Sequence, residues 1–377
     1  MSTADASTAD TTAMIGRPRP VVASLPAYKP GKDAKQAEVD EGVADAIKLA
    51  SNENPDAPID PVLAAVRAAA GGVNRYADHR AVEVRRRLAE WIGIDPTMVS
   101  VGNGSVGILQ QIHLTWVDPG DEVLFPWRSF EVYPIFAQLA GATAVRVPLT
   151  ERLDYDVDGL IAGLSERTKL VMLATPNNPT GTVIALDDIA RIATAAGPGT
   201  LVVVDEAYRE FVGDDLGDPV HDLLPAHPNV LITRTLSKAH GLAGLRMGYA
   251  IGHPQVIADF DKTTLPFAVN ALAQAGAIAA IEYIDEITAR AQSIVVERGR
   301  VEAALRGSGW WMPEHRANFV YLSTGPRTEE LTALLERRGV VVRPFAGEGI
   351  RVTIGSPAEN DRFLAALDGV DPVGLAS

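Results

Sequence analysis

Short apolar runs alternate with helical patterns along most of the chain. Six runs rich in Val, Ile and Leu are nearly continuous: VSVG (99–102), ATAVRV (142–147), KLVMLA (169–174), TLVVVDE (200–206), NVLITRT (229–235) and MGYAIG (247–252). Apolar strands separated by helices are typical of an α/β fold with a mostly parallel sheet covered on both faces. Ligands bind such sheets outside the carboxyl ends of the strands. We therefore expect the polar residues that follow these strands to form the functional site.

The pattern changes near residue 285. Two helical stretches, 271–284 (Ala-rich) and 287–305, lead into shorter apolar runs at 318–323, 339–343 and 350–355. This change predicts a second, smaller α+β domain. The expected division is a disordered leader at 1–20, an N-terminal arm contributing to the small domain at 21–50, a large domain at 51–284 and a small domain at 285–377.

Composition narrows the classes of protein that fit. The chain has 377 residues, 47% of them hydrophobic, enough for two or three domains with a large core. A net charge of −14 argues against nucleic acid or an anionic membrane as a partner. There is no cysteine, so disulfides and a thiol nucleophile are excluded. No apolar run reaches the roughly 18 residues of a membrane span, and MSTADASTADTT does not read as a secretory signal, so we expect a cytoplasmic location.

A single lysine lies among small and apolar residues in TLSKAHGLAGLRMGYAIG (235–252). Burial disfavours the ammonium form of Lys238, and the positive charge of Arg246 nearby would disfavour it further. Lowering its pKa toward neutrality takes roughly three units, or about 4 kcal/mol, a cost that proteins rarely sustain without a use. The commonest use is a Schiff base with a carbonyl compound. A lysine whose stem is buried and whose amine reaches solvent is the equal alternative.

Two further strands end in polar residues. Asp205 closes the apolar run TLVVVD, and a carboxylate there needs a cation or hydrogen-bond donors. A protonated pyridine nitrogen would serve, although a helix N-cap or a magnesium ligand fits Asp205 alone at least as well. In KLVMLATPNNPTG, prolines hold the chain so that Asn178 could present its amide to a ring oxygen. A simple Pro-Asn turn is the alternative there.

The stretch VSVGNGSVG places Gly102, Gly104 and Gly107 between a strand and a helical pattern. Such a junction offers backbone N–H groups and a helix dipole to a phosphate. A dinucleotide site would need an acidic residue at the end of the next strand. Asp121 and Glu122 instead precede that strand, so a single phosphate fits this loop better.

Together, SKAHGLAGLRMGYAIG, TPNNPTG and DEAY resemble the fold-type I pyridoxal-phosphate aminotransferases of classes I and II. More narrowly, the chain is similar to the histidinol-phosphate aminotransferase group and its actinobacterial aromatic (phenylalanine) aminotransferase branch. The resemblance begins near Leu25 and runs into the C-terminal region, through LPAYKPGK, KLASNENP, NRYADHR, PWRSFEVYP and VVRPFAGEGIRVTIG. It implies a large, mostly parallel sheet of the seven-stranded type beside a smaller α+β domain.

The resemblance also implies a role for each matching residue. Lys238 would carry pyridoxal 5'-phosphate as a Schiff base, and Asp205 would keep the pyridine nitrogen protonated. Asn178 and Tyr208 would hold the ring hydroxyl. Phe130 would stack on the ring face, and Tyr76 would reach the coenzyme of the partner subunit. The phosphate would be held by Gly104, Ser105, Val106, Thr235, Ser237 and Arg246. The contact of Tyr76 implies a homodimer.

At the substrate end, the family uses the position of Arg351 for the substrate carboxylate or for the phosphate of histidinol phosphate. Arg343 is its expected neighbour, and Tyr28 and Asn52 are further candidates for substrate contact. For either arginine alone, a surface ion pair is the alternative. Tyr28, Trp127, Phe130 and Phe345 could line a side-chain pocket or lie in the core.

Two positions depart from the family pattern. His240 replaces the usual tyrosine or phenylalanine, and NRYADHR lacks the usual proline after Tyr76. For His240 we expect a structural residue with satisfied hydrogen bonds rather than a role near the lysine. The other six histidines show no ligand spacing, so we expect no metal site.

The expected activity is ping-pong transfer of an amino group. An aromatic L-amino acid of the phenylalanine or tyrosine type would donate it, 2-oxoglutarate would accept it, and Lys238 would move the proton as general base and acid. Histidinol phosphate is the alternative donor. A nicotinamide-dependent oxidoreductase would leave Lys238 and NPTG unexplained, and a transcriptional regulator would need a DNA-binding domain.

Overall fold

The computed structural model describes residues 16, 18–25 and 32–372. Most of the expected leader at 1–20 and the candidate Tyr28 therefore lie outside the described residues. Within them, the first helix is α1 (Pro20–Ser24). None of the helices in this described part combines the length and apolar character needed to cross a bilayer.

The large domain is built on a seven-stranded sheet with the order β2-β8-β7-β6-β5-β3-β4. Neighbouring strands are parallel except at β8, which runs antiparallel to both β2 and β7. This arrangement confirms the mostly parallel sheet expected from the apolar runs. The strands are β2 (Val99–Asn103), β3 (Glu122–Trp127), β4 (Thr143–Pro148), β5 (Thr168–Ala174), β6 (Leu201–Asp205), β7 (Val230–Thr235) and β8 (Met247–Gly252).

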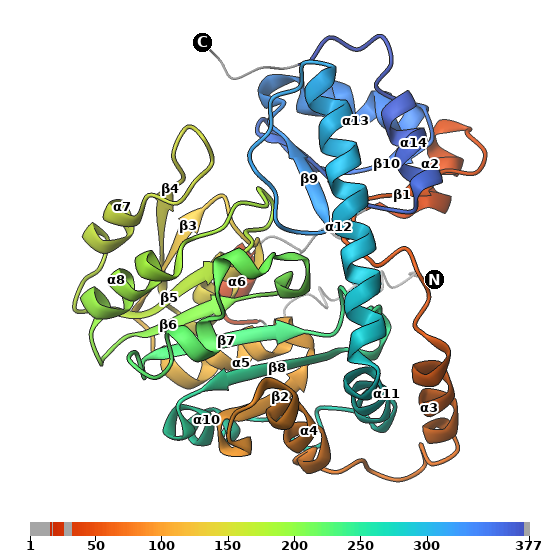
Figure 1. The fold of residues 1–377 in the computed structure, drawn as a ribbon. Helices are drawn as coiled ribbons and strands as arrows, with labels where there is room; N and C mark the ends of the chain where they lie inside the picture. Colours follow the sequence, from red (N-terminus) through yellow and green to blue (C-terminus); the bar gives the residue numbers. More distant parts are fainter. Residues whose placement is uncertain (1–15, 17, 26–31, 373–377) are drawn as a thin grey trace, which may run out of the picture.

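Helices cover both faces of this sheet (Figure 1). In β5, Leu170 and Met172 belong to a core formed with α5, α6 and α10, whereas Val171 and Leu173 belong to a core formed with α4, α7, α8 and α11. Since alternate residues of a strand point to opposite faces, burial on both faces makes each strand apolar throughout. The helices of this domain are α3 (Asp60–Ala70), α4 (Val82–Ile92), α5 (Gly104–Trp116), α6 (Val132–Ala140), α7 (Val157–Ala162), α8 (Leu186–Ala196), α9 (Pro219–Asp222), α10 (Pro254–Asp261) and α11 (Ala271–Glu282).

The small domain packs helices against short strands at the top of Figure 1. The long helix α12 runs up to it from the large domain, and an antiparallel sheet has the order β11-β12-β9. A second sheet pairs β1 of the N-terminal segment in parallel with β10. The elements of the small domain are α2 (Ala34–Glu41), β1 (Ile47–Lys48), α12 (Ile284–Gly307), β9 (Phe319–Leu322), α13 (Thr328–Arg337), β10 (Val340–Val341), β11 (Arg343–Phe345), β12 (Gly349–Thr353) and α14 (Pro357–Ala365).

One apolar run does not form a single strand. GVVVR divides between β10, which pairs with β1, and β11, which pairs with β12. The division has a functional consequence because Arg343 of β11 lies directly opposite Arg351 of β12. Residues opposite each other on adjacent strands share a face of the sheet. The small domain therefore presents both arginines on one side.

Candidate active site

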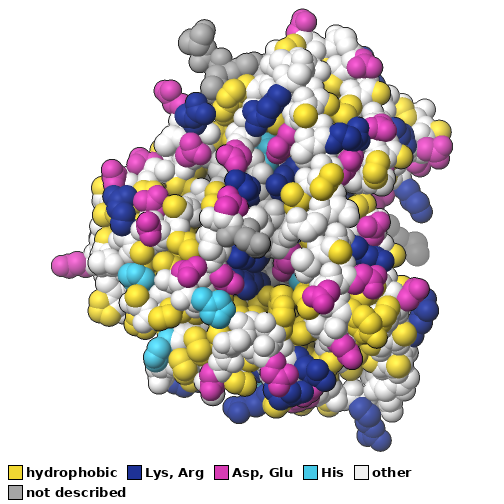
Figure 2. Space-filling view, in the orientation of Figure 1, with side chains coloured by type: hydrophobic (Ala, Val, Ile, Leu, Met, Phe, Trp, Pro, Cys, Tyr) yellow, Lys and Arg dark blue, Asp and Glu magenta, His cyan; other side chains and the backbone are white. Residues whose placement is uncertain are grey.

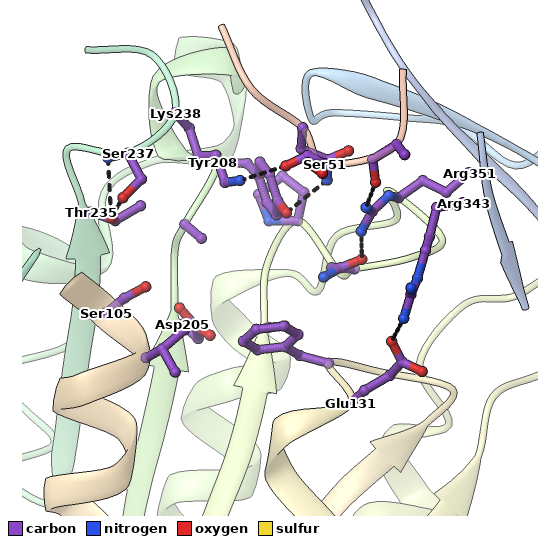
Figure 3. Close-up of a pocket in the computed structure, with 18 of the residues that line it drawn as sticks. Ser51, Ser105, Glu131, Asp205, Tyr208, Thr235, Ser237, Lys238, Arg343 and Arg351 are labelled. Carbon is purple, nitrogen blue, oxygen red and sulfur yellow. Dashed lines mark hydrogen bonds and ion pairs between the residues drawn. The ribbon is translucent and has the colours of Figure 1, made fainter. Parts of the chain in front are cut away.

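A cavity of about 240 Å³ lies between the carboxyl ends of the large-domain strands and the strands of the small domain. On the surface, basic and acidic side chains gather where the two domains meet (Figure 2). Close up, side chains from both domains converge on the cavity (Figure 3). Its lining residues include thirteen of the predicted ones: Asn52, Ser105, Val106, Phe130, Asn178, Asp205, Tyr208, Thr235, Ser237, Lys238, Arg246, Arg343 and Arg351.

Lys238 follows β7 and points into this cavity. Its Nζ donates a hydrogen bond to the carbonyl oxygen of Ser51 at 3.1 Å. Burial lowers the pKa of the Lys238 amine to about 7, and the positive charge of Arg351 lowers this pKa more than that of Arg246 does. A substantial fraction of this amine is therefore neutral near neutral pH, which is the nucleophilic form. The depressed pKa was expected from the sequence, but the leading role of Arg351 was not.

Asp205 lies at the carboxyl end of β6 and is buried. Tyr133 Oη donates to Asp205 Oδ2 at 2.8 Å, and Thr233 Oγ1 donates to Oδ1 at 3.1 Å. Burial raises the pKa of the Asp205 carboxyl to about 6, against the two hydrogen bonds that lower it. A cation beside this carboxyl would hold it ionised. Sequence reasoning missed both donors, although Tyr133 belongs to the quoted motif PWRSFEVYP.

The first turn of α5 forms an anion-binding end of the cavity. Gly104 opens the helix with a φ of +71°, and a Cβ atom there would lie 2.3 Å from Nη2 of Arg246. Arg246 Nη1 donates to Ser237 Oγ at 3.3 Å, and Ser105 and Thr235 line the same cavity. Free N–H groups and the helix dipole attract a phosphate to such a turn. Gly104 is thus required for the close approach of the guanidinium.

This glycine-rich loop is not part of a dinucleotide-binding unit. It follows β2, which is an edge strand whose one neighbour in the sheet is the antiparallel β8. The dinucleotide motif needs a βαβ unit whose strands run parallel. The sheet therefore supports the single-phosphate interpretation.

Tyr208 is held in the middle of the cavity by Asn52. Asn52 Nδ2 donates to Tyr208 Oη at 2.9 Å, and Thr353 Oγ1 donates to Asn52 Oδ1 at 3.1 Å. Asn52, which was predicted as a substrate residue, is buried, and its side chain is hydrogen-bonded to these two neighbours. Phe130 lines the same cavity, and its ring packs edge-on against that of Tyr133 with centroids 5.8 Å apart.

The two small-domain arginines have different neighbours. Arg351 donates to the side-chain oxygen of Asn178 and, at 2.7 Å, to the carbonyl of Ala50. Arg343 forms an ion pair with Glu131, with Nη2 and Oε2 2.6 Å apart (Figure 3). Glu131 was not predicted, because nothing in its local sequence distinguishes it from a solvent-exposed residue at the start of a helix.

Three of the residues considered for the site do not line this cavity, and one of them, Tyr76, was expected at the partner subunit's coenzyme rather than at its own. Tyr76 does not line the cavity of its own chain; its side chain is 83% exposed and stacks on Phe267 with ring centroids 4.4 Å apart. Trp127 and Phe345, considered for a side-chain pocket, line an adjoining cavity of about 720 Å³ between α6 and α13. This second cavity meets the first at Glu131 and Arg343.

The expectation for His240 was wrong in one respect: the residue is buried, as a structural histidine would be, but the expected hydrogen bonds are not found among the described residues. The ring is buried, yet neither nitrogen has a hydrogen-bond partner among the described residues, and Glu210 Oε1 is 3.9 Å from Nδ1. Burial lowers the pKa of His240 to about 4, so the ring is neutral. The ring packs edge-on against Trp91 at 6.3 Å, so it fills space rather than satisfying a polar network. No group of three or more potential ligand side chains for a metal occurs in the described ranges.

The residues of the main cavity fit pyridoxal phosphate. The coenzyme requires an anion site for its phosphate, an amine for its aldehyde and a carboxylate for its pyridine nitrogen. The α5 cradle with Arg246, the Lys238 amine and the buried Asp205 carboxyl provide these three groups in one cavity. Burial raises the pKa of Asp205, and a protonated ring nitrogen beside its carboxyl would favour the ionised form.

Known proteins of similar sequence and structure agree with this site. A family model described as aminotransferase class I and II matches residues 44–367. An aromatic amino acid aminotransferase of Mycolicibacterium vanbaalenii is 46% identical over 358 residues, which is 95% of this chain and 99% of that protein. Its counterpart in Streptomyces avermitilis is 46% identical over 91% of this chain and 94% of that protein.

Among solved structures, histidinol-phosphate aminotransferase from Sinorhizobium meliloti in complex with pyridoxal-5'-phosphate superposes with a TM-score of 0.85. It is 31% identical, and the match covers 94% of this chain and 97% of that one. An aspartate aminotransferase from Thermotoga maritima is 26% identical, with a TM-score of 0.78 over 89% of this chain and 93% of that one. The fold is thus the expected fold-type I, and the chain belongs to the class I and II aminotransferases.

Proposed function

We propose that this protein is an aromatic amino acid aminotransferase that passes the amino group of phenylalanine- or tyrosine-type substrates to 2-oxoglutarate. The observation that carries the reaction type is the meeting of the Lys238 amine, the buried Asp205 carboxyl and the α5 anion cradle in one cavity beside Arg351. The substrate class is supported by relatives of that name, 44–46% identical over more than nine-tenths of the chain.

Each group in the cavity has a task in this reaction. When bound, pyridoxal phosphate supplies an electron sink for the substrate's α-carbon. The Lys238 Nζ, whose pKa of about 7 makes both its neutral and its protonated form available near pH 7, would take the proton from the α-carbon and later return a proton, as general base and acid. Asp205 would keep the ring nitrogen of the bound coenzyme protonated, and Arg351 would bind the α-carboxylate with its guanidinium fork. The Gly104–Arg246 end would hold the phosphate and so keep the coenzyme within reach of the Lys238 amine.

Histidinol phosphate is the second candidate substrate. A solved enzyme of that name superposes over 94% of this chain, at a lower identity of 31%. Both donors would present an anion to Arg351, so the two activities differ in what the remaining cavity accepts. The ion pair between Glu131 and Arg343 favours the aromatic amino acid, because it leaves less positive charge for a phosphate dianion.

A homodimer and a cytoplasmic location belong to the same proposal and rest on resemblance to the family. For the dimer, the exposed Tyr76 adds support, because it stands outside its own cavity at a position that the family uses for the partner's coenzyme.

The deciding experiment compares kcat/KM for phenylalanine and histidinol phosphate, with 2-oxoglutarate as acceptor, on the purified holoenzyme. We expect phenylalanine to be preferred by at least about tenfold, which corresponds to about 1.4 kcal/mol. Lys238→Ala is the control and should lose turnover with both donors, because it removes the amine that moves the proton. Preference for histidinol phosphate would replace the proposed substrate, and full activity of Lys238→Ala would refute the reaction type.

A further inference from the structure

Glu131 occupies a position that the reaction described above does not use. It follows Phe130, directly before α6 in the large domain, and its carboxylate reaches across to Arg343 of β11 in the small domain (Figure 3). The Arg343 side chain is only 13% exposed, and that of Glu131 is 35% exposed. The contact therefore joins the two domains at the rim of the substrate cavity, partly shielded from solvent.

The two arginines at this end form a pair of like charges. Arg343 and Arg351 are opposite each other in the β11–β12 register, and like charges at such positions repel. Arg351 donates to uncharged acceptors, the Asn178 amide oxygen and the Ala50 carbonyl, whereas Arg343 faces the Glu131 carboxylate. Glu131 thus compensates the charge of one arginine of the two.

The charged side chains at the substrate end of the cavity have a net positive charge. Among the described residues that line the cavity, the carboxylates are Glu131 and Asp205, and Asp205 lies at the far end with Tyr133 and Thr233. Of the described residues at the substrate end of this lining, two are arginines and one is a glutamate, so these three side chains together carry one net positive charge. An amino acid brings one negative charge in its α-carboxylate, whereas a phosphate monoester brings about −1.5 to −2 at pH 7.

We propose that Glu131 is a specificity-determining residue that selects a substrate with a single carboxylate over one with a phosphate ester. By occupying Arg343, it removes the second cation that a dianion requires, and it places a carboxylate where the additional phosphate charge would lie. Like charges held close in a partly buried site oppose binding. This inference rests on the proposed function, because it explains why the same fold would take phenylalanine rather than histidinol phosphate.

The test is Glu131→Gln, which keeps the size and polarity of the side chain and removes its charge. On the holoenzyme, we expect the ratio of kcat/KM for histidinol phosphate to that for phenylalanine to rise about tenfold, since the exposure of Glu131 limits the effect. Glu348→Gln is the matched control, because Glu348 forms an ion pair with the neighbouring Arg128 outside the main cavity. Its ratio should stay at the wild-type value.

A second measurement does not depend on turnover. Phenylpropionate and phenylethylphosphonate share a ring and a two-carbon chain and differ in the charge of the anion when the phosphonate is fully ionised at alkaline pH. Glu131→Gln should strengthen binding of the phosphonate about tenfold relative to the carboxylate, measured by calorimetry on the holoenzyme.

The outcomes separate this inference from the proposed function. Both ratios unchanged in a folded Glu131→Gln variant that still prefers phenylalanine would overturn the role of Glu131 and leave the proposed function standing. A wild-type enzyme that prefers histidinol phosphate would overturn the proposed function. It would also overturn the inference, since Glu131 would then be present without the selectivity assigned to it.

Discussion

Two hydroxyl groups set the ionisation of Asp205, the residue assigned to the ring nitrogen. Burial raises the pKa of Asp205 to about 6, and the hydrogen bonds from Tyr133 and Thr233 limit that rise. Without these donors the carboxyl would be neutral over more of the working pH range and would pair poorly with a cation. Tyr133 itself is fully buried, so its hydroxyl has a fixed orientation.

Tyr133→Phe is therefore expected to weaken coenzyme binding about tenfold, since a hydrogen bond to a charged group contributes about 1.5–3 kcal/mol. The pKa of Asp205 would rise further above 6, so the acid limit of coenzyme binding should move to higher pH. Equilibrium dialysis across pH measures both effects.

The control for this prediction is Tyr155→Phe. Tyr155 is also buried in the large domain, but its hydroxyl donates to the carbonyl of Ala174 rather than to Asp205. Its acid limit should match that of the wild type. Identical acid limits for the Tyr133 and Tyr155 variants would contradict the assignment of Tyr133 to the Asp205 carboxyl.

At the scale of elements, the phosphate cradle depends on the contact between β8 and the first turn of α5. A Cβ atom at Gly248 of β8 would lie 2.5 Å from the backbone N of Ser105 and 2.7 Å from the carbonyl carbon of Gly104. Backbone atoms cannot turn aside as a side chain can. Glycine at this position is what allows the helix to begin directly against the sheet.

Gly248→Ala should therefore displace the start of α5 and raise the dissociation constant of pyridoxal phosphate at least about tenfold, as anion-binding N–H groups move away from the phosphate. Gly252→Ala is the matched change on the same strand, where a Cβ atom would meet the movable Cδ1 of Leu231 at 2.8 Å. We expect the latter variant to bind the coenzyme almost as the wild type does. Fluorescence titration of the two apoproteins compares them, and equal affinities would argue against the cradle.

For the whole molecule, an exposed apolar group suggests how two chains would meet. The side chain of Tyr76 is 83% exposed and stacks on Phe267, which is 41% exposed, and Leu265 nearby in the chain is 74% exposed. Exposed apolar residues gathered in this way are typical of an interface. In the proposed homodimer they would be covered by the second copy and would bring Tyr76 to its coenzyme.

Phe267→Glu is expected to shift the protein from dimer to monomer and to weaken coenzyme binding in the same variant, because it places a charge in the interface and removes the support of Tyr76. Sedimentation and dialysis report the two effects. Val296→Glu, an equally drastic change at an exposed position of α12, should leave the dimer intact. A wild-type protein that sediments as a monomer would contradict the proposal.

Local sequence patterns predicted the strands and the helices between them. They also predicted which polar residues lie at the strand ends. Continuous apolar runs indicated strands buried on both faces, and Asp205, Asn178 and Lys238 lie at the end of such runs or within a few residues after them. The burial of Lys238, which is the largest cause of its lowered pKa, was indicated by its apolar neighbours in the chain. These features depend on residues within one or two elements, so the sequence alone determined them.

Contacts between distant segments were decided by the tertiary structure. Tyr133 and Asp205 are 72 positions apart, and Glu131 and Arg343 are 212 apart, so no periodicity along the chain connects them. The division of GVVVR between two sheets depends on β1, from the other end of the chain. His240 finds no hydrogen-bond partner among the described residues because of what packs around it. Local sequence thus determined which groups could perform the chemistry, and long-range packing determined which partners control their charge.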